Sequence, residues 1–141
     1  MEAKVIWNRK GLQFDGSADS GSMAHLASSL DSGQSGFQPM ELLGIGLAGC
    51  TAMDVISILK KKNQDVVDFE VIVHTRNAED HPKVWNWVQI EYVVSGRNID
   101  PRAVERAMEL SSQKYCPAQN MINKAVDIEL VYRIIETDSE K

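Results

Sequence analysis

The sequence contains only two cysteines, Cys50 and Cys116, in 141 residues. Two cysteines are too few for the disulfide framework on which small secreted domains depend, and in a reducing compartment such a pair is either inert core or redox chemistry. Basic residues are not in excess, because 15 Lys and Arg stand against 20 Asp and Glu, giving a net charge of −5. This balance argues against a nucleic-acid partner, since nucleic-acid-binding domains usually carry a basic surface.

Long uninterrupted apolar runs are also missing. The longest apolar stretch, residues 42–59, contains Thr51, Asp54 and Ser57. A membrane-spanning helix needs about 18 or more nearly uninterrupted apolar residues. Residues 1–7 have no apolar core of the length that a signal peptide requires. We therefore expect a cytoplasmic protein that has no membrane partner.

The histidines and serines show none of the common catalytic or metal-binding spacings. His25, His74 and His81 are scattered and have neither a second histidine four residues away nor a Cys-x-x-Cys pair beside them. Such spacing predicts no metal site, and we expect no cofactor. No G-x-S-x-G sequence is present, which argues against a Ser-His-Asp hydrolase.

What is present is a hydrophobic fraction of 43% in a chain of single-domain length. The expected elements begin with a hairpin of strands 4–7 and 12–15, a strand in 23–28 and a long helix from Pro39 to about Lys62. Strands 69–76 and 84–95 follow, and after them a helix from the N-cap Asp100 to about Ser112 and a short helix from Pro117. A strand 126–135 and a frayed tail 136–141 come last. Because strands and helices do not alternate regularly, the order predicts an α+β domain.

The long helix carries a glycine motif. Residues 42–58 are apolar on nearly every face, which is typical of a helix that is buried all round. Residues 44–49 match the dinucleotide fingerprint G-x-G-x-x-G, but that motif needs a strand directly before it. Because residues 38–43 start a helix instead, we interpret the glycines as thinning the helix so that other backbone can approach. A cofactor-binding oxidoreductase is the minor alternative.

Cys50 lies in the middle of this helix. Helical side chains lean over the turn that precedes them, and the residue four positions before Cys50 is Gly46. The sulfur is therefore expected to face an open pocket, lined by Leu43, Leu47 and Met53.

Cys116 has a different local context. It directly precedes Pro117, and as the N-cap of a helix its sulfur would meet free N–H groups, which favours the thiolate. The alternative is that each cysteine has only a structural role, as a small buried hydrophobic residue.

At these residues the sequence resembles the OsmC/Ohr family of thiol-dependent peroxide-reducing proteins, and within it the YhfA-like branch. The resembling segments are Pro39-x-Glu41-Leu42-Leu43 with Ala48-Gly49-Cys50, Asp54-Val55-Ile56, Ile58-Leu59-Lys60-Lys61, Gly96-Arg97-Asn98-Ile99, Ala107-x-Glu109-Leu110-Ser111 and Lys114-Tyr115-Cys116. The resemblance implies one OsmC-like domain over residues 1–141. It also implies an intertwined homodimer, in which antiparallel-rich sheets wrap long buried central helices.

The resemblance also implies a reaction. Cys50 matches the peroxidatic cysteine, which attacks an organic hydroperoxide, and Cys116 matches the resolving cysteine, which closes a disulfide with it. A lipoyl-type dithiol then restores the pair. A redox-sensing or apolar ligand-binding protein on the same dimeric fold is the alternative, and it predicts the same disulfide.

The resemblance also implies two supporting residues, Arg9 and Glu41, although Glu41 is shifted by one position from the family's pattern. Arg9 fits the family's Arg-x-Gly turn, where a guanidinium lowers the pKa of the reactive thiol and holds a peroxide oxygen. The family's Glu directly follows the Pro, but Met40 stands there and Glu41 comes one residue later, a rotation of about 100° on a helix. The alternatives are a solvated turn arginine and an ordinary first-turn acid.

Overall fold

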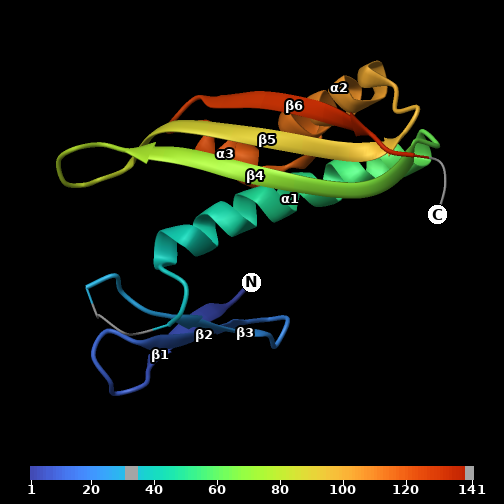
Figure 1. Cartoon of the computed structure of the whole chain (residues 1–141). Helices are drawn as coiled ribbons and strands as arrows, with labels where there is room; N and C mark the ends of the chain where they lie inside the picture. The colour runs from blue at the N-terminus through green and yellow to red at the C-terminus, as the bar shows by residue number, and fades with distance from the viewer. Residues whose placement is uncertain (31–34, 139–141) are drawn as a thin grey trace. The chain divides into compact units, whose positions relative to one another are not determined.

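The structure is a computed structural model that describes residues 1–30 and 35–138, and the chain divides into two compact units, Met1–Gly44 and Ile45–Lys141. The elements are β1 (Ala3–Trp7), β2 (Phe14–Ala18), β3 (Met23–Leu26), α1 (Pro39–Lys61), β4 (Asp65–Asn77), β5 (Trp85–Arg97), α2 (Pro101–Leu110), the π-helical turn η1 (Ser111–Tyr115), α3 (Pro117–Ile122) and β6 (Ile128–Glu136). The predicted α+β class is confirmed (Figure 1).

The first unit contains an antiparallel sheet in the order β1-β2-β3. Its predicted hairpin is confirmed, with Trp7 paired to Phe14 at the closing end. The connecting turn places Arg9 at a φ of +73° and Gly11 at +46°. Glycine enters this left-handed region freely, whereas the Cβ of an arginine is crowded there. The turn therefore holds Arg9 in a backbone conformation that is unusual for its residue type.

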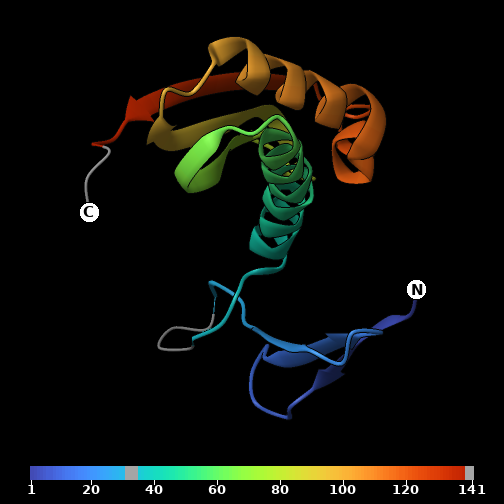
Figure 2. The same ribbon diagram turned by 90° about the vertical axis from the view of Figure 1, so that its right-hand side faces the viewer.

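The second unit is built on a sheet in the order β4-β5-β6. The expected strands 69–76 and 84–95 are present within β4 and β5, which pair antiparallel, while β6 runs parallel to β5. A parallel pair needs a long crossover connection, and the segment from α2 to α3 supplies it. Figures 1 and 2 show α1 and this segment against one face of the sheet.

The core of the second unit lies between that face and the helices. The inward residues of β5 alternate along the strand, as the pleat of a strand requires. They pack with the buried residues of α1 and α2; the cluster comprises Leu47, Val55, Leu59, Val88, Ile90, Tyr92, Val94, Ile99, Ala103, Val104, Ala107 and Met108. The expected last strand is confirmed as β6, and its residues Ile128, Leu130 and Ile134 pack against the same cluster.

One chain alone does not bury α1 all round, and burial of its remaining faces stays a prediction for the dimer. The buried residues of α1 are Leu47, Thr51, Val55 and Leu59, spaced four apart along one stripe, whereas Met53 is 73% exposed. The reason is that the sheet and α2 of one chain cover only one side of the helix.

The glycine motif lies inside this helix. α1 begins at Pro39, so no strand precedes the glycines, and the dinucleotide-binding alternative is wrong because its strand-turn-helix geometry is missing. The expected close backbone neighbour is not found within the described part of one chain, where a Cβ built at Gly44, Gly46 or Gly49 meets no atom within 4 Å beyond its own helix.

α1 is long and apolar enough to cross a bilayer, but the core helix of a soluble protein can have the same length and composition. Two of its polar side chains have partners within the second unit. Thr51 bonds Tyr92 of β5, and Asp54 accepts a hydrogen bond from Ser111. These contacts are those of a helix packed inside a folded unit.

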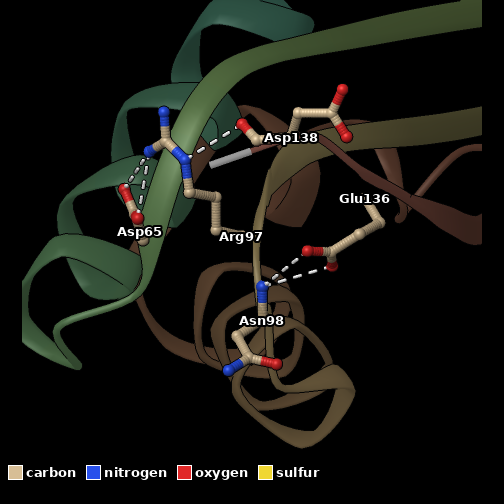
Figure 3. Close-up of polar contacts among 5 residues, drawn as sticks. All are labelled: Asp65, Arg97, Asn98, Glu136 and Asp138. Carbon is tan, nitrogen blue, oxygen red and sulfur yellow. Dashed lines mark hydrogen bonds and ion pairs between the residues drawn. The ribbon is translucent and has the colours of Figure 1, made fainter. Parts of the chain in front are cut away.

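Polar contacts join the ends of β4, β5 and β6 (Figure 3). Arg97 Nη1 lies 3.1 Å from Asp65 Oδ2, and Arg97 Nε donates to the carbonyl of Asp138 at 3.2 Å. The backbone N–H of Asn98 donates to the Glu136 carboxylate at 3.2 Å. The predicted fraying is therefore wrong for residues 136–138, because long-range polar contacts hold them. Residues 139–141 lie outside the described residues.

Candidate functional site

The two cysteines come from different elements of the second unit. Cys50 is half-buried in the middle of α1, whereas Cys116 has no exposed surface. The turn η1 carries the chain from α2 to Cys116, and the Cys116 backbone N–H donates to the Ser111 carbonyl at 2.8 Å. This bond spans five residues, the pattern of a π-helical turn, and such turns occur frequently at functional sites.

Cys116 is the N-cap of α3, as predicted. Its Sγ accepts a hydrogen bond from the backbone N–H of Gln119 at 3.3 Å. The side chain of Cys50 lies near enough to this thiol to raise its pKa. Helix α1 and the start of α3 thus bring the two thiols together, and both are free in this structure.

The prediction that its position favours the Cys116 thiolate is wrong. Burial raises the pKa of Cys116 from 9.0 to about 11, the Gln119 N–H acts in the opposite direction, and both Cys50 and Asp54 add to the increase. One N–H at a short helix does not offset the cost of placing a charge where water is excluded. Cys116 therefore keeps its proton at neutral pH.

Sequence reasoning missed a buried polar network beside the thiols. Thr51 Oγ1 lies 2.8 Å from both Tyr92 Oη and Ser111 Oγ. Ser111 Oγ donates to Asp54 Oδ2 at 2.9 Å, and Gln119 Nε2 donates to Thr51 Oγ1 at 3.0 Å. The one available signal was the presence of Thr51 and Asp54 inside an otherwise apolar helix. Their partners are distant in sequence, so no local pattern reveals them.

Tyr92 is the member of this network at the end opposite Asp54. Burial raises its pKa to about 12, so the phenol stays protonated at neutral pH and can donate a hydrogen bond. Every side chain of the network except Asp54 is almost inaccessible to solvent, and Asp54 is half-buried. The arrangement is a buried set of hydroxyl and amide groups that leads to a single carboxylate.

Arg9 and Glu41 belong to the first unit, whereas both cysteines belong to the second. Arg9 is exposed on its turn. Glu41 Oε1 accepts a hydrogen bond from the backbone N–H of Gln38 at 2.8 Å, which satisfies a free donor at the start of α1 in the manner of a capping box. The structure thus gives Glu41 a local capping contact, and the catalytic roles of both residues stay predictions.

The residues predicted to line a pocket over Cys50 point in different directions. Leu47 is 1% exposed and belongs to the core, so its place in an open pocket is wrong, because this position faces the sheet. Gly46 does leave open space. Leu43 and Met53 are largely exposed. The described part of the chain gathers no group of three His, Cys, Asp or Glu residues that could hold a metal ion.

Comparisons with known proteins agree on one family. Residues 32–131 match the family model described as OsmC-like protein. The protein YhfA of Escherichia coli K12 is 38% identical over 135 residues, which cover 96% of this chain and 98% of YhfA. A hypothetical protein from Aquifex aeolicus VF5 has a TM-score of 0.85 at 26% identity, covering 97% of each chain. The organic hydroperoxide resistance protein OhrB of Bacillus subtilis shares the fold, with a TM-score of 0.64 at 20% identity, covering 94% of this chain and 98% of OhrB.

Proposed function

The chain belongs to the OsmC family, and on that premise we propose that Cys50 and Cys116 form a redox couple that reduces organic hydroperoxides. The observation that carries the proposal is that a half-buried thiol lies near a fully buried thiol, and that the buried thiol holds its proton. A thiol that donates a hydrogen bond to a neighbouring sulfur stabilises negative charge on that sulfur. Cys50 is thereby the nucleophile and Cys116 the resolving thiol.

The reaction proceeds in two steps. The Cys50 thiolate attacks the outer oxygen of the hydroperoxide, an S–O bond forms, the O–O bond breaks, and the alkoxide leaves as an alcohol after taking up a proton. Cys50 is then a sulfenic acid. The Cys116 sulfur attacks the Cys50 sulfur, an S–S bond forms, and hydroxide leaves as water with the proton of the Cys116 thiol. An external dithiol of the lipoyl type supplies the two electrons that reopen the disulfide.

Arg9 is proposed to support this reaction from the first unit. A guanidinium next to the reacting oxygens stabilises the charge that develops on the leaving oxygen. Its left-handed backbone conformation supports a functional role, because strained residues cluster at functional sites.

The substrates are proposed to be organic hydroperoxides in preference to hydrogen peroxide. Burying apolar substrate surface is worth about 25 cal/mol per Å², so an aryl group that buries on the order of 100 Å² gains about 2.5 kcal/mol. That gain corresponds to about 70-fold in kcat/KM where it survives to the transition state.

We also propose that the protein is a homodimer. The outer face of α1 carries Ile45, which is 51% exposed, and Met53, which is 73% exposed, next to the uncovered Gly46 and Gly49. An apolar helix face of this kind is normally covered in the functional assembly. A second copy that covers it would also enclose the half-buried Cys50.

Binding of a small apolar ligand is the second candidate function, and one observation favours it. The first unit contains a cavity of about 610 Å³, lined mainly by Val5, Leu12, Phe14, Leu26, Pro39 and Met40. Its size and apolar lining are typical of small-molecule sites. A ligand-binding protein would form the Cys50–Cys116 disulfide without turning over.

A steady-state assay distinguishes the two functions. Consumption of cumene hydroperoxide, tert-butyl hydroperoxide and hydrogen peroxide is measured with dihydrolipoamide, dithiothreitol or glutathione as the reductant. The peroxidase proposal expects many turnovers with a dithiol and loss of all turnover in Cys50→Ser. Oxidation that stops after one equivalent with every reductant contradicts the peroxidase and supports the ligand-binding candidate.

A further inference from the structure

We propose that Asp54 is a positioning residue for the disulfide step. Asp54 is the last acceptor in a chain of hydrogen bonds between hydroxyl groups, and this chain holds the η1 turn that places Cys116 near Cys50. The inference rests on the proposed redox couple and assigns a role to a residue outside it. Asp54 lies one helical turn after Cys50 on α1, so the two side chains are neighbours on the helix surface.

The direction of the chain follows from counting hydrogens. Each hydroxyl has one hydrogen to donate, and an ionised carboxylate can only accept. Because Ser111 gives its hydrogen to Asp54, it must accept from Thr51 at their 2.8 Å contact. Thr51 has then used its hydrogen, so Tyr92 must donate to Thr51. The sequence of donors is therefore Tyr92, Thr51, Ser111, ending on Asp54.

Gln119 connects this chain to the resolving thiol. Its side-chain Nε2 donates to Thr51 Oγ1 at 3.0 Å, and its backbone N–H donates to Cys116 Sγ at 3.3 Å. Ser111 is connected to the same residue from the other side, because its carbonyl accepts the Cys116 backbone N–H at 2.8 Å. Both residues that fix Cys116 are thus held by the chain that Asp54 terminates.

The network has little tolerance for loss of its last acceptor. Thr51 and Ser111 have no exposed surface, and Gln119 is 3% exposed. If Asp54 cannot accept, Ser111 must turn its hydrogen elsewhere, and the orientation of each hydroxyl behind it changes. A buried polar network holds one arrangement firmly only while it is fully satisfied. Removing the acceptor is therefore expected to loosen the η1 turn and misplace the Cys116 sulfur.

Asp54 also acts on Cys116 through its charge. The titratable groups that raise the pKa of the Cys116 thiol are Cys50 and Asp54, and those that raise the pKa of Tyr92 by their charge are Cys116 and Asp54. Asp54 is thus the one carboxylate acting on both buried acids. Its charge helps to keep the proton on the Cys116 thiol.

The first test measures how fast the disulfide closes in the full-length reduced protein. One equivalent of cumene hydroperoxide is added, and closure is followed by rapid quenching with a thiol-alkylating reagent and mass spectrometry. Asp54→Ala and Ser111→Ala are expected to slow closure by about tenfold or more, because small misplacements of reacting atoms have effects of this size. The matched controls Asp80→Asn, an exposed loop carboxylate, and Ser112→Ala, in the same turn, are expected to close at the wild-type rate.

The second test separates charge from structure with Asp54→Asn, which keeps an oxygen that accepts from Ser111. In a Cys50→Ser background the only thiol is Cys116, and its ionisation is followed by absorbance at 240 nm, with the double variant Cys50→Ser/Cys116→Ser subtracted to remove tyrosine. Asp54→Asn is expected to lower the midpoint of this titration, because it removes the charge that opposes the thiolate. A purely structural role for Asp54 would leave the midpoint unchanged.

Closure at the wild-type rate in both Asp54→Ala and Ser111→Ala overturns the positioning role of Asp54. An unchanged Cys116 titration in Asp54→Asn overturns the effect assigned to its charge. Repeating the closure test with diamide, an oxidant that accepts two electrons from a pair of thiols, keeps this result independent of the peroxidase. Failure of the wild type to form the disulfide with either oxidant contradicts the redox couple itself. Normal wild-type closure with unaffected variants contradicts only the role of Asp54.

Discussion

The two units of this chain differ in how many of their own residues they bury. Among the described residues of Met1–Gly44, only Gln13, Gly16 and Ala27 are buried, while Ile6 and Trp7 of β1 are more than half exposed. The second unit has an extended core between its sheet and its helices. A sheet of three short strands has little stability unless its apolar face is covered. The first unit therefore has little core of its own, whereas the second unit has an extended core and leaves only the outer face of α1 uncovered.

The chemistry follows the same division. Both thiols and the buried network belong to the unit that has its own core, where neighbouring groups are fixed and water is excluded. Arg9 and Glu41, the proposed supporting residues, belong to the unit with little core. We infer that the second unit supplies the reacting atoms, while the first unit supplies support that can be altered without loss of the reaction itself.

The strongest test of this division compares one substitution from each unit. Cys50→Ser is expected to abolish hydroperoxide consumption, because it removes the nucleophile. Arg9→Ala is expected to lower kcat/KM about a hundredfold, the effect of losing one group that stabilises developing charge. Since Arg9 would act on the oxygens, the ratio of kcat/KM between an aryl hydroperoxide and hydrogen peroxide is expected to stay unchanged. Steady-state kinetics with both substrates measures all three quantities.

Lys10→Ala is the control in the same turn and is expected to behave like the wild type. Cys116→Ser is expected to allow a single turnover that ends with Cys50 as a sulfenic acid or a more oxidised form. Wild-type turnover in Cys50→Ser would contradict the assignment of the nucleophile. An unaffected Arg9→Ala would leave Arg9 as an ordinary turn residue.

In the proposed dimer, a second copy of the chain covers the exposed apolar face of α1. Light scattering is expected to give a mass near 31.4 kDa, twice the chain mass of 15.7 kDa. Met53→Asp places a charge on the exposed apolar face of α1, and a charge is expensive to bury without a partner. This variant is expected to lower the mass toward that of one chain, whereas Ser57→Asp, on an exposed position of the same helix, is not. A wild-type mass near 15.7 kDa with native circular dichroism would refute the dimer.

The buried acids of the second unit predict a loss of stability at alkaline pH. Burial raises the pKa of Cys116 from 9.0 to about 11, so between these values the unfolded chain loses the thiol proton while the folded chain keeps it. The free energy of unfolding is therefore expected to fall as the pH rises from about 9 to about 11, by about 3 kcal/mol at most from this group. Urea unfolding in reducing buffer at several pH values measures the slope.

Cys116→Ser is the control for that slope, because its hydroxyl still accepts from Gln119 but does not titrate in this range. It is expected to show a shallower loss of stability above pH 9. Identical slopes in the wild type and Cys116→Ser would mean that the thiol ionises equally in the folded and unfolded chains.

The smallest expected effect concerns backbone strain. Among the described non-glycine residues, those with positive φ in the second unit are Asn63 and Asn98, while the one in the first unit is Arg9. Asparagine tolerates the left-handed region, but arginine is disfavoured there by about 1–2 kcal/mol. Part of that strain is offset by the greater chain entropy of glycine, so Arg9→Gly is expected to stabilise the protein by about 0.5 kcal/mol while lowering activity. Thermal unfolding measures the change, and Lys10→Gly, which relieves no such strain, is expected to destabilise.

The sequence alone determined the features that depend on neighbouring residues. Asp100 before Pro101 and Cys116 before Pro117 were predicted as N-caps, and both cap their helices. The long helix from Pro39 and the alternating strand that became β6 were also predicted, with ends within a few residues of those observed. Each of these patterns acts over one or two turns of chain, so the sequence contains all the information that they need.

The tertiary structure decided everything that depends on what covers a residue. It buried one stripe of α1 and left Met53 exposed, and it placed Leu47 in the core. It also joined Thr51 to Ser111, which is distant in sequence, and reversed the predicted effect on Cys116. The local sequence supplies the N–H that stabilises a Cys116 thiolate, but the larger opposing cost is loss of water. That cost depends on how α1, β5 and the η1 turn pack together, which no pattern within a few residues can specify.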